Sequence, residues 1–177
     1  MDLADVLKKI NYFAKSSIPV DVEGLAMALG LYVEKQDNLG NISGIIKRRN
    51  DKYIIVVNNE HPEVRQRFTI SHEIGHFFYH RNKIGDGIVD DALYRHSDCK
   101  GIINNNVNLE DEKQANNFAA NLLMPTSAIT KLIAENNNKI DSSYLADKLK
   151  VSTEAINIRL AGLGKQLMIS SKDLKKS

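Results

Sequence analysis

The sequence predicts an α+β fold in which a small three-stranded sheet is followed by two long helices and a group of shorter ones. Three short segments rich in β-branched residues lie between residues 31 and 58, and turn-forming residues separate them. Two segments with strong helical periodicity follow, at about residues 61–80 and 109–124. Because the short strands are joined by short turns, we expect them to form an antiparallel meander.

Two helices are expected before the sheet. Apolar residues at helical spacing predict a first helix over residues 2–15, and Pro19 then interrupts helical structure. Asp21 stands at the N-cap position of a short second helix that continues through Leu29 and ends at Gly30. The strands that follow are expected at residues 31–35, 42–47 and 53–58.

A long loop and a helical C-terminal part are expected after the sheet. Residues 82–107 are polar and lack periodicity, and a loop of this length in a compact domain is often functional. Residues 142–164 form a pattern like helix-turn-helix, with Ser152 as the N-cap of its second helix. That helix carries one arginine, Arg159, so we favour a helix pair packed on the main domain over a DNA-reading element. The expected division is a main domain at 1–135, the C-terminal helices at 140–165 and a tail at 166–177.

Composition and charge exclude several function classes. The net charge of +2 gives no strongly basic chain, so contact with nucleic acid would need a local patch. The sequence has neither an apolar run of about 18 residues nor a basic leader before an apolar core, so we expect no membrane span and no secretory signal. Cys99 is the one cysteine, which excludes an intrachain disulfide and a multi-cysteine metal site and favours a cytoplasmic location.

The strongest functional signal is the pattern H-E-x-x-H at residues 72–76, which falls inside the first long helix. Residues four apart lie on one helix face, so His72 and His76 can bind one zinc ion together. Glu73, next to that face, is placed to act as general base on a water molecule held by the metal rather than as a ligand. The flanking residues are apolar, so this is a core helix, in which such polar residues would be costly without a function.

A catalytic zinc ion needs a third protein ligand. A metzincin would have glycine at position 79 and histidine at position 82, but Tyr79 and Asn82 stand there, so that class is excluded. His80 lies one turn beyond His76, too far along the helix axis to join the same tetrahedron. We interpret His80 as a rim or capping histidine.

The second long helix offers a better third ligand, Glu112. Asp111 and Glu112 both flank the apolar face of this helix, so periodicity alone does not choose between them. Glu112 reaches one methylene further, and Asn116 stands one turn beyond it, where it can hydrogen-bond a ligating histidine. Asp111 is interpreted as a favourable charge near the helix N-terminus. We therefore expect one zinc ion per chain, held by His72, His76 and Glu112.

Two segments together resemble a known family. They are R-F-T-I-S-H-E-I-G-H at residues 67–76 and E-K-Q-A-N-N-F-A-A-N-L-L-M-P at residues 112–125. These segments look like the ImmA/IrrE metallo-endopeptidases, and further similarities extend the resemblance from about residue 19 to 164. The resemblance implies a zincin-like minimal domain of the gluzincin type, with the same three zinc ligands and with Glu73 as general base. Ser71 replaces the more usual alanine before the motif, which is a minor departure.

The resemblance also implies a function. Family members occur in bacteria, phages and mobile elements and act on, or are paired with, helix-turn-helix repressors, so we expect a zinc endopeptidase that cleaves such a repressor. The sequence has no sensor domain after its helices and so resembles the short, ImmA-like form. The alternative is a non-proteolytic, zinc-containing regulator, of an antitoxin-like kind, that binds a partner protein or DNA. Glu73 favours the enzyme, because a structural zinc site needs no general base.

Three further predictions concern substrate binding, DNA binding and catalysis. The strand at residues 42–47 is the expected edge for an extended substrate, because Gly44 would permit close approach of another backbone. DNA binding is expected to be weak or absent. The long loop carries candidates for stabilising the oxyanion or contacting the substrate, namely Tyr94, Arg95 and His96.

Overall fold

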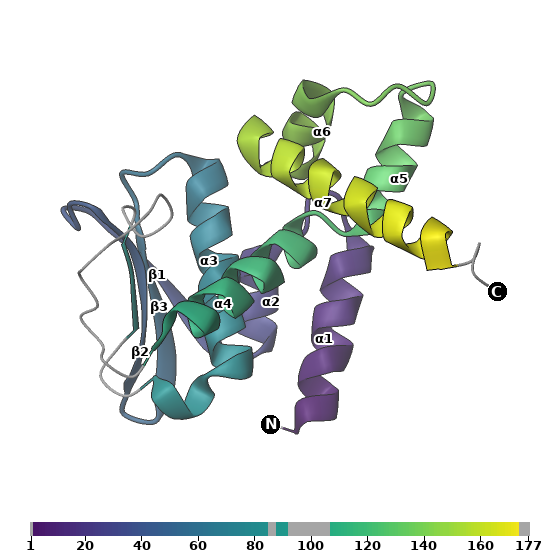
Figure 1. Cartoon of the computed structure of the whole chain (residues 1–177). Coiled ribbons are helices and arrows are strands. Elements are labelled where there is room, and N and C mark those ends of the chain that lie inside the picture. Colours follow the sequence, from purple (N-terminus) through teal and green to yellow (C-terminus); the bar gives the residue numbers. More distant parts are fainter. Residues whose placement is uncertain (1, 85–87, 92–106, 174–177) are drawn as a thin grey trace.

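The chain folds as a mixed four-stranded sheet against which one long helix packs, with the other helices on and beyond that helix (Figure 1). The α+β class predicted from the sequence is confirmed. This computed structural model describes residues 2–84, 88–91 and 107–173. Its helices are α1 (Leu3–Ser16), α2 (Val22–Ala28), α3 (Glu63–Tyr79), the 3-10 helix η1 (Arg81–Lys83), α4 (Leu109–Leu123), α5 (Thr126–Glu135), α6 (Ser142–Leu149) and α7 (Thr153–Asp173). Its strands are β1 (Leu31–Gln36), β2 (Ile42–Arg49), β3 (Lys52–Asn58) and β4 (Ile88–Asp91).

The strand order is β1-β3-β2-β4, so β3 lies between β1 and β2. β1 pairs with β3 in parallel, while β3 with β2 and β2 with β4 are antiparallel. The expected three-stranded antiparallel meander is therefore wrong, both in the pairing of β1 and in the number of strands. The physical reason lies in β3, where residues 54–57 are all buried. A continuous buried run of this kind is typical of a central strand.

β2 is also a central strand, which contradicts its assignment as the edge for substrate addition. Gly44, Ile45 and Ile46 pair with β3 on one side and with β4 on the other. The backbone hydrogen-bonding groups of this part of β2 are thus taken by its neighbours. In the described part of the chain, the outermost strand on that side is β4.

Local sequence signals account for how several elements begin and end. Asp21 caps α2, since its side chain accepts a hydrogen bond from Gly24 N–H at 2.9 Å. Asn50 and Asp51, between β2 and β3, both have positive φ, at 49° and 60°. Two such residues match the type I′ turn that fits the twist of a hairpin. Each of these positions was readable from the sequence because the interaction is local.

Helix α3 lies between the sheet and α4, and residues 69–77 along it are buried without interruption. Two glycines permit this close packing. A Cβ at Gly44 would lie 2.3 Å from Thr69 Cγ2, so β2 can approach α3 only because that side chain is absent. A Cβ at Gly75 would lie 3.0 Å from Ala115 Cα, so α3 and α4 meet backbone to backbone. The close approach expected at Gly44 is thus made by α3 rather than by a substrate.

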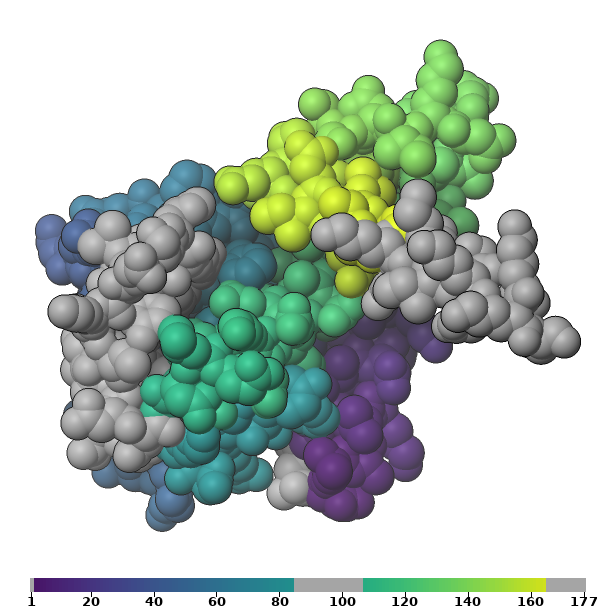
Figure 2. Space-filling model, viewed as in Figure 1, coloured from purple at the N-terminus to yellow at the C-terminus, as the bar shows by residue number. Residues whose placement is uncertain are grey.

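The C-terminal helices pack on the rest of the chain through a shared core. Leu145, Leu149 and Ile156 are fully buried in the same apolar cluster as residues of α3 and α4. Figure 2 shows these helices, in green and yellow, against α4 and α1. Helix α7 continues to Asp173, past residue 165, where the sequence places the start of a tail. Among the described helices, none has the length and hydropathy needed to cross a lipid bilayer.

We expect Gly75→Ala to destabilise the fold, because the new methyl group would press on Ala115 and on Phe118 Cβ, 3.2 Å away. Overpacking of this kind costs about 1–3 kcal/mol. Gly162→Ala is the matched control, because a Cβ at this α7 position meets no described atom within 4 Å. It should leave stability unchanged or raise it by about 0.5–1 kcal/mol. Denaturant unfolding measures both variants, and equal midpoints would contradict the tight contact at Gly75.

Candidate metal centre

Helix α3 carries three ionisable side chains into the core. His72, Glu73 and His76 are each at most 1% exposed, in a stretch whose other large side chains are apolar. Buried polar groups cost free energy unless they have partners, so the partners of these side chains define the site.

Glu112 on α4 forms a cluster with the two histidines. Its Oε2 lies 3.3 Å from His72 Nε2, its Oε1 lies 3.3 Å from His76 Nε2, and the two Nε2 atoms are 3.0 Å apart. One ligand atom from each residue lies within 4.8 Å of the others. Nitrogen and oxygen ligands at about 2.0–2.1 Å from a tetrahedral ion would lie about 3.3 Å from one another. The donor set and its spacing therefore fit a single metal ion.

The protonation states of the cluster also favour a cation. Burial raises the pKa of Glu112, but hydrogen bonds with His72 and His76 outweigh burial and lower this pKa to about 2. Burial lowers the pKa of His76 below its ordinary value of 6.5, against the opposing effect of its hydrogen bond with Glu112. At neutral pH Glu112 is ionised and the His76 ring is neutral. Metal binding requires these two protonation states.

His72 is held from its outer side by a residue of α4. His72 Nδ1 lies 3.1 Å from Asn116 Oδ1, one turn along α4 from Glu112. The ring of Phe68 stacks on the imidazole, with centroids 6.5 Å apart. A hydrogen bond donated by Nδ1 leaves the lone pair on Nε2, which is the atom that faces Glu112. The orientation of His72 is therefore set by α3 and α4 together.

Glu73 lies where α3 meets the sheet. It is 0% exposed, and its Oε1 is 3.7 Å from the position that a Cβ would take at Gly44. Successive helical residues are rotated by about 100°, which turns Glu73 away from the face that His72 and His76 share. The carboxylate is accordingly not a member of the three-residue cluster.

Two polar residues beside the cluster have contacts that sequence reasoning missed. His80 follows α3 as its C-cap, but it is 3% exposed rather than at a rim, and its Nδ1 lies 3.1 Å from His76 Nδ1. Asp111 contacts His80 and Lys83 in addition to its place in the first turn of α4. The spacing of four residues from His76 to His80 was a signal for the first contact. No local signal pointed to the contacts of Asp111.

Three of the sequence-predicted site residues lie outside the described part of the chain. These are the candidates for oxyanion stabilisation or substrate contact, Tyr94, Arg95 and His96.

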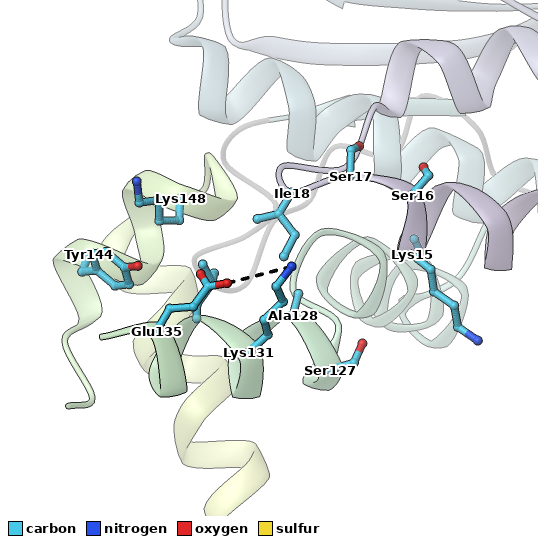
Figure 3. Close-up of a pocket in the computed structure, with 12 residues that line it drawn as sticks. Lys15, Ser16, Ser17, Ile18, Ser127, Ala128, Lys131, Glu135, Tyr144 and Lys148 are labelled. Carbon is cyan, nitrogen blue, oxygen red and sulfur yellow. Dashed lines mark ion pairs between the residues drawn. The ribbon is translucent and has the colours of Figure 1, made fainter. Parts of the chain in front are cut away.

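Hollows among the described residues occur in several parts of the fold. One of about 580 Å³ lies among α1, α5 and α6, where Lys131 pairs with Glu135 at 3.9 Å (Figure 3). It contains no residue of the metal cluster. Two others, of about 330 and 370 Å³, share Phe68, Ala155 and Ile158 between α3 and α7. Because Phe68 stacks on His72, these two hollows begin beside the cluster.

A comparison with protein-family models gives a match. The family model Peptidase_M78, described as the IrrE N-terminal-like domain, matches residues 26–161, which include the complete cluster. No curated protein matches the chain.

In the metal-free protein, we expect the midpoint of His76 protonation to lie below pH 6.5, because burial lowers the pKa of this ring. Because its pKa is lower in the folded chain than in the unfolded chain, protonation favours unfolding. The stability linked to this group is therefore complete above pH 6.5 and falls as the pH drops from there towards the folded pKa. An NMR titration of the histidine rings, assigned with His76→Gln, measures the midpoint. A midpoint at or above 6.5 would disagree with this expectation.

Proposed function

Since the chain belongs to the Peptidase_M78 family of metallopeptidases, we propose that it is a zinc-dependent endopeptidase that hydrolyses a peptide bond in a protein. The observation that carries the proposal is the convergence of His72, His76 and Glu112, with Glu73 buried next to His72 on the same helix. A donor set of two imidazoles and one carboxylate leaves a position open on a four-coordinate ion, as in catalytic zinc sites.

In this proposal the roles of the residues follow from their positions. His72, His76 and Glu112 hold the ion, and Asn116 keeps the hydrogen of His72 on Nδ1. Zinc held there would supply a Lewis acid that polarises the scissile carbonyl and lowers the pKa of a water molecule. Glu73 takes a proton from the attacking water and delivers it to the departing amine.

We further propose that the protein substrate is a helix-turn-helix transcriptional repressor. The support is the resemblance of the two motif segments to the ImmA/IrrE enzymes. The metalloprotease domain is assigned to residues 1–135 and the C-terminal helices to residues 140–165. Tyr94, Arg95 and His96 remain the proposed groups for oxyanion or substrate contact.

We expect Glu73→Gln to keep its zinc but to cleave about 10²–10⁴-fold more slowly, because an amide cannot carry the proton. The measurement pairs zinc content with cleavage of a candidate helix-turn-helix repressor, and chelator-treated wild type provides the baseline. Glu110→Gln is the matched control, since Glu110 is an exposed residue of α4 that faces Lys113 at 3.9 Å. It should cleave at the wild-type rate.

Each outcome of this experiment has a separate meaning. Wild-type cleavage by zinc-loaded Glu73→Gln would remove the proton-transfer role. An inactive, zinc-loaded wild type would argue against this repressor as substrate. A wild type that binds no zinc would contradict the metal site itself.

We expect duplex DNA to bind weakly. Arg159, the arginine of the helix that would read DNA, donates to Met124 O at 3.2 Å and to Thr126 Oγ1 at 3.5 Å. With that guanidinium held by the protein, few phosphates can be neutralised, and affinity at physiological salt should be no better than roughly 10⁻⁴–10⁻⁶ M. Fluorescence anisotropy at two salt concentrations measures this affinity. A sequence-specific complex of nanomolar affinity would favour the alternative, a non-proteolytic regulator.

A further inference from the structure

The outer nitrogen of His76 faces another histidine rather than water. His76 Nδ1 lies 3.1 Å from His80 Nδ1, one turn further along α3. On the other side of that ring, His80 Nε2 lies 3.2 Å from Asp111 Oδ1 and 3.2 Å from Gln114 Oε1. His76 is 0% exposed and His80 is 3% exposed. A chain of contacts therefore runs from the metal cluster through two imidazoles to a carboxylate on α4.

The Asp111 carboxylate, at the end of this series of contacts, is held in place by Lys83 and by the backbone of Asn108. Asp111 Oδ2 accepts from Lys83 Nζ at 2.6 Å and from the backbone N–H of Asn108 at 2.9 Å. The contact with Asn108 is half of the capping box that begins α4. Because Oδ2 accepts from these two donors, Oδ1 is the carboxylate oxygen that faces His80.

The two ends of this series of contacts, the metal cluster and Asp111, require the same arrangement of ring hydrogens. A carboxylate can only accept, so His80 donates from Nε2 to Asp111, and its Nδ1 then carries a lone pair. A metal ion on His76 Nε2 places the hydrogen of His76 on Nδ1, where it can only donate. The His76 N–H and the His80 lone pair face each other, so each ring has the tautomer that its neighbour needs.

We propose that His80 and Asp111 are positioning residues of the metal centre, which fix the ring of His76 in the orientation and tautomer that leave Nε2 to the ion. The inference rests on the proposed zinc site but not on the identity of the substrate. Helix α4 then supports both histidines of the motif, through Asn116 for His72 and through Asp111 and His80 for His76. Loss of such an outer hydrogen bond typically lowers metal affinity by roughly 10–100-fold.

Two substitutions at one position separate hydrogen bonding from packing. His80→Phe keeps a ring of similar size but cannot accept from His76 Nδ1–H, whereas the side-chain carbonyl of His80→Gln can. We expect His80→Phe to weaken zinc binding by roughly 10–100-fold in competition with a chelator, and His80→Gln to recover most of that loss. Tyr79→Phe is the matched control at the same helix end, because Tyr79 is 51% exposed. It should bind zinc as the wild type does.

A second measurement uses the zinc-loaded wild-type protein and does not depend on any variant folding. Nitrogen-15 NMR should find the hydrogen of His80 on Nε2 and a His76 Nδ1–H that exchanges slowly with water. A hydrogen on His80 Nδ1 would overturn the proposal, as would equal zinc affinity in wild type and His80→Phe, or His80→Gln binding no better than His80→Phe. A wild type without zinc affinity would refute the metal site of the proposed function, which is a different result.

Discussion

The close packing of α3 between β2 and α4 is the constraint on which the metal cluster depends. The ligand atoms come from two helices, so the cluster can form only if the helix axes approach closely. Gly75 permits that approach, because the space of its missing side chain is taken by the backbone of Ala115. Gly44 does the same on the other side, where β2 meets Thr69 and Glu73. A glycine inside a helix destabilises that helix. Gly75 offsets this cost by allowing the short distance between α3 and α4.

The same packing forces polar groups into the core, and the structure pairs them with one another. Within the buried stretch 69–77, His72 and His76 both contact Glu112, and His76 also contacts His80. As a source of stability alone, such a buried charged cluster is poor, since apolar residues of similar volume often do as well or better. A cation between the three ligands would account for the burial of the cluster. The hydrogen bonds with His72 and His76, which lower the pKa of Glu112 to about 2, keep its carboxylate ionised for such a cation.

Local signals in the sequence were enough to predict most helices and strands, while the pairing of strands was not local. Helix caps, turns and periodicity each depend on a few neighbouring residues, so positions such as Asp21 and the pair Asn50-Asp51 could be read directly. The parallel pairing of β1 with β3 depends on how the sheet is covered, although the unbroken apolar run at residues 54–57 was a usable sign of a central strand. β4 was missed because Ile88–Asp91 is short and lies in a polar segment.

Part of the site could likewise be predicted from the sequence and part could not, and Asp111 and Glu112 show why. In the sequence these two acids compete for one role, the third ligand, because both flank the apolar face of α4. In the structure they face different histidines, Glu112 the two Nε2 atoms of the cluster and Asp111 the Nε2 of His80. The rotation of about 100° between neighbouring residues of a helix is what separates the two directions. Asp111 also forms the capping box with Asn108 at the start of α4. The same carboxylate therefore caps α4 and contacts His80, whose other ring nitrogen faces His76. The start of α4 and the orientation of the His76 ring, a proposed metal ligand on α3, are thereby coupled through a single carboxylate.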